Sequence, residues 1–283
     1  MRDIVSPLSG FGSPFGQRRR GPSFLLDQFP GAAAAYSLRK LSADTTNAVR
    51  VRRSSDNTEA DFTPAQIGDG SLLAWVGAGV SNNGLVTTWY DQSGNANHAT
   101  QATAASQPKI VDAGALVTEN GKVALSFDGS DDTLVTGNPV ITTNTWFVEL
   151  VGNYSGSGMI LSQHGPGTGR LVFFEADPLR MFFNNGDSFA GVSGYSSISS
   201  SLFTSAAFNN DYYLATRGNA LEKVIESQPL TPNRRLSIAS GNQGNSFFGV
   251  LNANEILVYA SDQSANRANI EANIADYYGI TLA

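Results

Sequence analysis

A chain of 283 residues is long enough for one large β domain with an appendage, or for two small domains. It contains no cysteine, which excludes disulfide scaffolds and thiolate metal sites, and no run of about 18 apolar residues, which excludes a membrane-spanning helix. Charged residues make up 15% of the chain, so the surface must consist largely of Ser, Thr, Asn, Gln and Gly, as in many secreted, sugar-binding and virion proteins.

Charge is divided unevenly along the chain. Residues 1–53 hold nine Lys and Arg against three Asp and Glu, whereas residues 54–283 hold nine against 21. A basic front end on an acidic body predicts that the front end docks onto another molecule, such as an acidic protein surface. Nucleic acid fits less well as a partner, because the basic cluster at 18–20 is short and lacks interleaved aromatics, and the acidic body repels phosphates.

Residues 1–31 are rich in Gly, Pro and Ser, with isolated Phe and Leu. Repeated Pro and Gly disfavour a helix or a central strand, and apolar residues spaced so widely cannot form a core. Composition alone fits a disordered tail equally well, but we expect an extended anchoring arm that lies along a partner. The expected anchoring residues are Phe11, Phe15, Arg18, Arg19, Arg20 and Phe24.

From about residue 32 the chain predicts β structure, because short alternating or apolar runs recur between Gly, Asn and Asp clusters. The expected strands include 49–52, 85–90, 123–127, 145–151, 171–174, 180–183, 236–239 and 255–259. Turn signals stand at Asp128-Gly129, Asn185-Gly186-Asp187 and Ser240-Gly241-Asn242.

Two helices are expected among these strands. One runs from Pro64 to about Val76, and the other covers 264–278 and is stopped by Gly279. Many short strands with few helices predict an all-β sandwich of two antiparallel sheets. No fixed repeat and no second core is visible, so residues 32–283 are expected to form one domain after the arm.

The stretch "WYDQSGNANHATQ", residues 89–101, gathers a carboxylate, a hydroxyl, amides and a histidine behind two aromatics. A tight turn closed by the Asp91 side chain explains much of it, because Gly94-Asn95 suits positive φ. A Ser-His-Asp triad does not fit, because Ser93 lacks a nucleophile elbow. The spacing of oxygens over 91–95 leaves calcium open, although the Gly and Glu of an EF-hand are missing.

A third interpretation of this stretch is sugar binding, because carboxylate and amide groups beside an aromatic platform suit hydroxyl-rich rings. A second histidine stands in the Gly-rich stretch "SQHGPGTGR", where a solvated loop residue and a ligand contact are both open. The candidate carbohydrate-binding residues are Trp89, Tyr90, Asp91, Asn95, His98 and His164.

Two segments carry a family resemblance. "AAYSLRKLSADTTNAVRVRRSSDNTEADF", followed by "VTTWYDQSGNANHATQ", resembles the catalytic domain of fungal-type α-L-arabinofuranosidase B. The match covers about residues 34–101 well and the rest in outline, including a closing helix, and it implies a concanavalin-like jelly roll. The same motifs behind a Pro/Gly-rich arm are also similar to virion proteins of tailed bacteriophages and related gene-transfer particles.

The resemblance implies a retaining glycosidase site with a nucleophile and an acid/base. Glu175 in "RLVFFEADPLRMFF" is the best match to the nucleophile. The acid/base is expected in a Gly-rich loop before the last strands, but "LSIASGNQGNSFFGV", residues 236–250, contains no Asp or Glu. Asp177 is a poor substitute, because Pro178 interrupts the strand. General acid catalysis is typically worth about 10²–10⁴-fold, so we expect the hydrolase site to be lost or never formed.

The expected function is that of a structural virion protein of a tailed phage or phage-like particle. Residues 1–31 would bind other virion proteins, and the jelly roll would display a carbohydrate-binding surface toward host polysaccharide. A homo-oligomer is expected, with a trimer favoured, and no cofactor, metal ion or nucleic acid. The alternatives are an α-L-arabinofuranosidase-like hydrolase and a cement protein without a ligand. The start of the chain lacks the apolar core of a signal peptide, so assembly is expected in the host cytoplasm.

Overall fold

In a computed structural model of the protein, the described residues are 24–165, 170–176, 180–184, 188–191, 201–208, 211–226 and 232–283. The helices there are α1 (Leu25–Gln28), α2 (Pro64–Gly68), α3 (Ser71–Val76), α4 (Arg267–Tyr278) and the 3-10 helix η1 (Ala104–Ser106). The shorter strands of the first half are β1 (Ala34–Ser37), β2 (Val49–Arg53), β3 (Glu59–Phe62), β4 (Gly84–Trp89), β5 (Ala99–Thr100), β6 (Lys109–Asp112), β7 (Ala115–Leu116), β8 (Thr118–Glu119), β9 (Lys122–Val123), β10 (Leu125–Asp128) and β11 (Leu134–Pro139). They are followed by β12 (Trp146–Ser155), β13 (Gly158–Gln163), β14 (Arg170–Ala176), β15 (Arg180–Asn184), β16 (Ser188–Gly191), β17 (Ser201–Phe208), β18 (Asp211–Thr216), β19 (Glu222–Glu226), β20 (Arg235–Ile238) and β21 (Val250–Tyr259).

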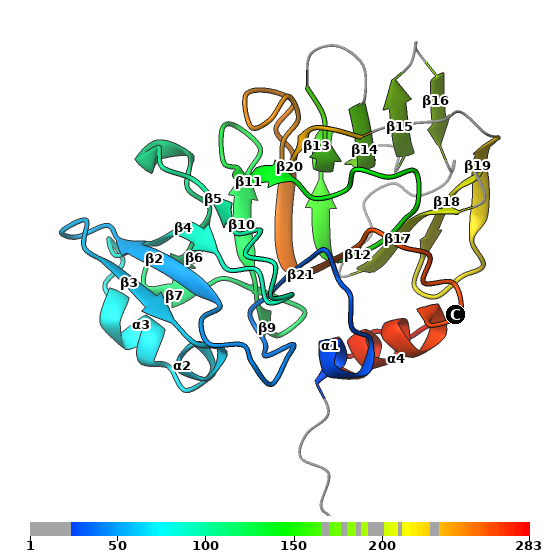
Figure 1. The fold of residues 1–283 in the computed structure, drawn as a ribbon. Coiled ribbons are helices and arrows are strands. Elements are labelled where there is room, and N and C mark those ends of the chain that lie inside the picture. Colours follow the sequence, from blue (N-terminus) through cyan, green and yellow to red (C-terminus); the bar gives the residue numbers. More distant parts are fainter. Residues whose placement is uncertain are drawn as a thin grey trace, which may run out of the picture.

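The named strands pair antiparallel throughout and divide into two branches that meet at β4 (Figure 1). One edge of β4 pairs with β2, which carries β3. The other edge pairs with β6 at its start and with β5 at its end. From β6 the first branch runs through β10, β21, β12, β17, β18 and β19. From β5 the second branch runs through β11, β20, β13, β14, β15 and β16.

The main core lies between the two branches. Trp146 of β12 and Phe173 of β14 meet edge to face, with ring centroids 5.9 Å apart, and both are fully buried. The strand period of two separates the faces of β21, where Ile256 and Val258 enter this core while Leu257 and Tyr259 point away from it. The predicted all-β jelly-roll sandwich is thereby confirmed.

A second apolar cluster covers the outer surface of β1, β21, β12 and β17, which we call the closed face. Helices α1 and α4 lie side by side over it (Figure 1). Ile270, Ile274 and Tyr278 of α4 are buried there, and Gly279 ends the helix with φ +67°. The predicted C-terminal helix is confirmed, although it begins at Arg267 and not at 264.

The predicted helix from Pro64 to Val76 is two helices in the structure. Thr63 and Gln66 form a capping box that starts α2 directly before Pro64. Gly70 then adopts φ +87°, which a continuous right-handed helix excludes, and it becomes the residue from which α3 begins. The sequence signal of this glycine was present but was not used.

The end of the predicted arm packs against the body. Leu25 and Leu26 are buried in the cluster over the closed face, and the Leu26 N–H donates to the Leu41 carbonyl at 2.9 Å. Residues 1–23, which include Phe11, Phe15 and the Arg18–Arg20 cluster, lie outside the described residues. The described chain therefore starts beside α4, at the end of the molecule opposite the β20–β21 connection (Figure 1). No described helix has the length and apolar character needed to cross a membrane.

Candidate functional site

The Asp91 side chain is the centre of a hydrogen-bond network that fastens its loop to β1, which we call the Asp91 lock. Its Oδ1 accepts hydrogen bonds from the backbone N–H groups of Ala35 and Ser93, both at 2.8 Å. Its Oδ2 accepts from the Ser93 hydroxyl at 2.8 Å and from the Asn97 N–H at 2.9 Å. The bond to Ser93 confirms the predicted turn closed by this side chain. The bond to Ala35, 56 residues away, fastens the turn to β1.

The amides of the same loop hold the backbone before and after β1. Gln92 Oε1 accepts from the Leu41 N–H, and its Nε2 donates to the carbonyls of Ser37 and Arg39. Asn95 Nδ2 donates to the Ala32 carbonyl at 2.9 Å, and Asn97 Nδ2 donates to the Ala33 carbonyl at 2.9 Å. These side chains bind backbone groups that a neighbouring strand would otherwise pair with. The first role of the loop is therefore to stabilise the fold.

The structure corrects one sequence expectation for this loop and bears on one alternative that the sequence left open. Trp89 is completely buried and packs against Tyr36 with ring centroids 5.8 Å apart, so it belongs to the core and not to a sugar platform. Both carboxylate oxygens of Asp91 already accept two donors each. They are therefore not available to the calcium ion that the oxygen spacing left open.

Tyr90 and His98, by contrast, lie on the surface of β4 and β5. Their rings meet edge to face at 5.0 Å, and the Tyr90 hydroxyl donates to Asp61 Oδ1 at 2.8 Å. Partial burial, followed by the bond to Asp61, raises the pKa of Tyr90 above its usual value. His98 Nδ1 accepts from the Asp91 N–H at 3.1 Å, so the proton of the neutral ring sits on Nε2, which is left as a donor.

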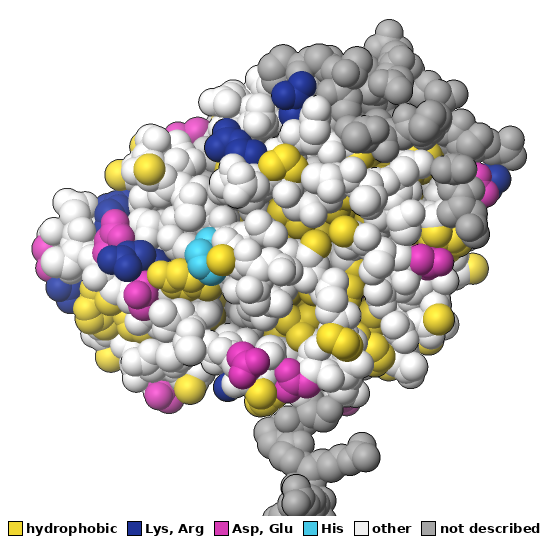
Figure 2. All heavy atoms as spheres, viewed as in Figure 1, with side chains coloured by type: hydrophobic (Ala, Val, Ile, Leu, Met, Phe, Trp, Pro, Cys, Tyr) yellow, Lys and Arg dark blue, Asp and Glu magenta, His cyan; other side chains and the backbone are white. Residues whose placement is uncertain are grey.

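The same polar surface continues across β2 and β3. Arg50 Nε donates to Glu59 at 2.8 Å, and its Nη1 donates to Asp61 at 3.3 Å. Arg53, at the end of β2, pairs with Asp56 in the following turn. We call the outer surface of β3, β2, β4 and β5 the open face. Figure 2 shows basic and acidic side chains gathered at this end of the molecule.

A groove of about 320 Å³ crosses the open face. Arg50 and Glu59 line one side, and Thr88 and Thr100, which pair across β4 and β5, line the other. Thr87, Gln101 and Gln107 complete the polar lining. The groove thus combines charged donors and acceptors with hydroxyl and amide groups, beside the Tyr90–His98 pair.

His164 belongs to a different region. It is 5% exposed, which excludes the solvated loop histidine, one of the two interpretations that the sequence left open. Its Nδ1 accepts from the Asn242 N–H at 3.0 Å, and its carbonyl accepts from the Gln243 N–H. The exposed ring of Phe247 lies edge-on against it at 5.6 Å. His164 therefore orders the loop 239–249 between β20 and β21.

The loop 239–249 concentrates backbone strain. Four of its residues other than glycine have positive φ, at a cost of roughly 1 kcal/mol each: Ala239, Asn242, Gln243 and Phe247. A Cβ at Gly241 would meet Met159 Sδ, so a larger residue there would require the Met159 side chain to move. Such strain is typical of functional loops, and no sequence signal beyond the Gly/Asn content indicated it.

Glu175, the candidate nucleophile, stands on β14 opposite Met159 of β13. Met159 also pairs with Phe248, so the strand of Glu175 lies one strand away from the loop 239–249. The Glu175 side chain and Asp177 lie outside the described residues.

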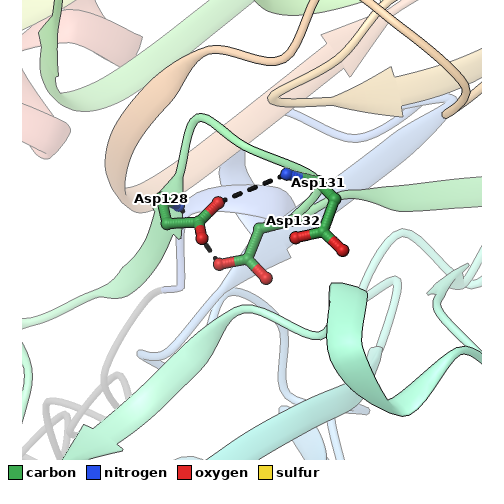
Figure 3. Close-up of side chains that lie close together, drawn as sticks. All are labelled: Asp128, Asp131 and Asp132. Carbon is green, nitrogen blue, oxygen red and sulfur yellow. Dashed lines mark hydrogen bonds between the residues drawn. The ribbon is translucent and has the colours of Figure 1, made fainter.

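The turn predicted at Asp128-Gly129 joins β10 to β11, but sequence reasoning missed that Asp128, Asp131 and Asp132 lie together there. Asp128 Oδ1 accepts from the Asp131 N–H, and the Asp128 N–H donates to Asp132 Oδ2 (Figure 3). Burial, and then the charge of Asp128, raise the pKa of Asp132 to about 6. Thr133, the next residue, bonds to Ser240, which places this turn against the loop 239–249.

No protein-family model and no curated protein sequence matches the chain. Among solved structures, an arabinofuranosidase complexed with arabinofuranosyl-α-1,2-xylobiose is similar over 89% of this chain, with a TM-score of 0.66 and 18% identity. A GH54 α-L-arabinofuranosidase soaked with a cyclic sulfate inhibitor is similar over 86%, with a TM-score of 0.62 and 15% identity. The chain spans 64% and 62% of the lengths of these two structures. The arabinofuranosidase-like fold is thereby established.

Proposed function

We propose that the protein is a carbohydrate-binding jelly roll that displays its open face to a polysaccharide and does not cleave it. The observation that carries this proposal is the exposed network of Arg50, Glu59, Asp61, Tyr90 and His98 beside the polar groove. Sugars need donors and acceptors together with an apolar ring face, and this network supplies all three.

The composition of the loop 239–249 argues against hydrolysis. Where the resemblance places an acid/base, this loop has Asn242, Gln243 and Asn245, and no carboxyl group. Amides do not protonate a leaving group at neutral pH. A site without its general acid retains the ability to bind.

The setting that we propose is a virion of a tailed phage or a phage-like particle, with residues 1–31 as the anchor. The positions of the chain's starting point and of the groove, on different faces of the molecule, support this role. The chain emerges from beside α4, at the closed face, so an attachment there leaves the open face and its groove uncovered.

Binding is tested by isothermal titration of the full chain with a panel of arabinan, arabinoxylan and bacterial capsular polysaccharides. Arg50→Ala should reduce the affinity for any glycan that binds by roughly tenfold, about the contribution of a charge-assisted hydrogen bond. Lys109→Ala is the matched control, because Lys109 forms an equally exposed ion pair with Asp112 outside the groove. Equal losses in both variants, or no binding by the wild type, would refute a glycan site on the open face.

One observation favours a second candidate function, hydrolysis of an arabinofuranoside. The buried Asp132, with a pKa of about 6, lies in the turn that packs against the loop 239–249, and Glu175 stands on a strand close to the same loop. A chromogenic arabinofuranoside separates the two functions. Turnover that is lost in both Glu175→Gln and Asp132→Asn would establish the hydrolase, and the absence of turnover in the wild type would support the binding role.

A further inference from the structure

The two ends of the described molecule differ in shape and in charge. One end has a groove of about 870 Å³ beside α1 and α4, which we call the end groove. The other end has two neighbouring loops, residues 128–133 and 239–250, which we call the tip (Figure 1). A strand pair between Asp128 and Val250 joins the two loops into one surface.

The surface of the tip is apolar in part. Phe247 is 56% exposed, and Val250, three residues later, is 38% exposed. Phe247 also has φ +57°, a conformation that a bulky side chain adopts only under strain. The fold therefore holds this ring in water in a strained backbone. A partner that covers the ring recovers the free energy of burying its apolar surface.

The tip is also acidic. Its charged residues are Asp128, Asp131 and Asp132, and its second loop contains no charged residue. One oxygen from each of the three carboxyl groups lies within 4.8 Å of the others (Figure 3). Asp132 is buried, whereas Asp128 is exposed and Asp131 is partly exposed. Two accessible carboxyl groups thus stand beside two exposed apolar side chains.

The end groove offers an apolar lining of matching kind. Leu25, Leu38 and Ile67 are buried in its lining, and Phe24 and the exposed Tyr277 add two aromatic rings. Its volume lies within the range of pockets that bind small molecules, so it can hold a phenyl ring and the residues beside it.

The charged lining of the end groove is entirely basic. Arg39 is already paired with a buried glutamate. Lys40 lies over the Phe24 ring at 5.2 Å, and Lys122 lies over the Tyr277 ring at 4.3 Å. Within the described part of the chain, neither lysine has a carboxylate within 4.0 Å. Two lysines beside an apolar lining complement the two accessible carboxyl groups and the apolar side chains of the tip.

The tip and the end groove stand at opposite ends of the molecule, so they meet only between copies (Figure 1). A contact between two different surfaces of the same chain is heterologous, and it repeats into a ring or a filament. The chain before Phe24 carries four arginines against one aspartate, which adds positive charge at the groove end. An acidic tip therefore fits this end better than a second groove end does.

We propose that the tip of one copy of this chain docks into the end groove of a second copy. Phe247 enters the apolar lining, and the accessible carboxyl groups of the tip pair with Lys40 and Lys122. The contact goes beyond the proposed sugar-binding role, because none of its residues lines the groove of the open face. Two loops in one groove bury a small area, so the association is weak and depends on concentration.

Sedimentation velocity of the full-length protein over a range of concentrations tests the association. The weight-average mass should rise above that of the monomer as the concentration increases. Phe247→Ser and Lys40→Glu/Lys122→Glu should each move this rise to a several-fold higher concentration. Val80→Ser is the matched control, because Val80 is 86% exposed but belongs to neither surface, and it should behave as the wild type. Thermal midpoints confirm that each variant is folded.

The absence of native cysteine allows a test of the head-to-tail direction. Asn245 is exposed on the tip, and Ala65 is exposed in the lining of the end groove. Oxidation of full-length Asn245→Cys/Ala65→Cys should give a ladder of covalent multimers, because every copy offers both surfaces. Asn245→Cys/Val80→Cys is the control, and its multimers should form in several-fold lower yield.

Three results would overturn the proposal. The first is a wild-type protein that stays monomeric up to its solubility limit. The second is association of Phe247→Ser and of Lys40→Glu/Lys122→Glu that equals that of the Val80→Ser control. The third is a covalent ladder that is equally strong in the two double-cysteine variants. None of these measurements uses a glycan, so failure of the docking contact and failure of the proposed sugar site can be distinguished.

Discussion

The closed face and the open face each carry an ion pair between an arginine and a glutamate, which is buried on the closed face and exposed on the open face. On the closed face, Arg39 binds Glu255 at 2.7 Å, and the carboxylate is 1% exposed. On the open face, Arg50 binds Glu59 at 2.8 Å, and both side chains are more than a third exposed. The shortest distances in the two pairs are nearly equal, but Arg39 binds Glu255 through two parallel bonds, whereas Arg50 binds Glu59 through one. The two pairs also differ in their access to water.

The exposure of each ion pair to water determines whether it stabilises the fold or can exchange its partners. The buried Glu255 is held by Arg39, by the Ser37 hydroxyl and by the Tyr278 hydroxyl, so its charge has a full set of donors that cannot be removed without loss. The exposed pair contributes little to folding and can exchange its partners for the hydroxyls of a ligand. The ion pair of the closed face is thus fixed by burial, whereas that of the open face remains accessible from solvent.

The sharpest test of this contrast is Arg39→Ala. It leaves a buried carboxylate without its counter-ion, and we expect the free energy of unfolding to fall by about 3–5 kcal/mol. Urea denaturation measures this change. A loss no greater than that of Arg50→Ala would show that burial does not distinguish the two pairs.

The Asp91 lock joins the two faces, because it ties β1 of the closed face to the end of β4. Asp91→Ala leaves the N–H groups of Ala35, Ser93 and Asn97 without their acceptor, and we expect a loss of about 3 kcal/mol. Asp91→Asn keeps one oxygen and should lose less. The thermal midpoints of the two variants measure the difference, and equal midpoints would contradict the assigned role of both oxygens.

A second carboxyl group of the closed face gives it a pH dependence. Thr204 Oγ1 lies 3.0 Å from Glu149 Oε2 and 3.1 Å from Glu271 Oε1. A hydroxyl carries one proton, so one of the two carboxyls must donate to it. Burial, and then the charge of Glu271, raise the pKa of Glu149 well above its usual value, whereas Glu271 binds Arg267 at 2.7 Å. Glu149 is therefore the protonated member.

Because the pKa of Glu149 is raised on folding, its contribution to stability is complete below the unfolded pKa of about 4.3 and is lost as the pH rises through the folded pKa. Glu149→Gln keeps a donor for Thr204 without an ionisable group. We expect the variant to gain stability relative to the wild type as the pH rises from 5 to 9. Urea midpoints across this range that stay parallel would rule out a neutral Glu149.

The smallest expected effect on stability comes from the open face. Arg50→Ala should change the free energy of unfolding by less than about 1 kcal/mol, because its ion pairs are exposed. Its effect should appear in glycan affinity instead. A large loss of stability with unchanged affinity would reverse the roles assigned to the two faces.

Strand periodicity and turn residues were enough to predict several of the strands and the closing helix. The run 255–259 lies within β21, the run 145–151 lies within β12 from Trp146 onward, and the Asp91 turn and the helix before Gly279 are present. These features depend on local chemistry, which a single sequence displays. The break at Gly70 was also local, and attention to its position would have separated α2 from α3.

Features that depend on distant partners could not be predicted in this way. The same Ser-Gly-Asn triplet occurs at 93–95 and at 240–242. In the first loop the side chains hold the backbone of residues 32–41, whereas in the second the backbone bonds mainly to itself and to His164. Composition does not reveal which residues face which partner, and the outward-pointing but buried Glu149 and Glu255 were missed for the same reason.

The pairing of β1 with the long strand β21 has a mechanical consequence for a tethered molecule. A pull on Phe24 that is directed along β1 and resisted by the rest of the sheet would have to slide Ala34–Ser37 past Glu255–Val258. In that direction the hydrogen bonds of the ladder share the force and are not broken one at a time. An attachment at the amino-terminal end thus pulls against one of the most resistant arrangements that a β-sheet offers.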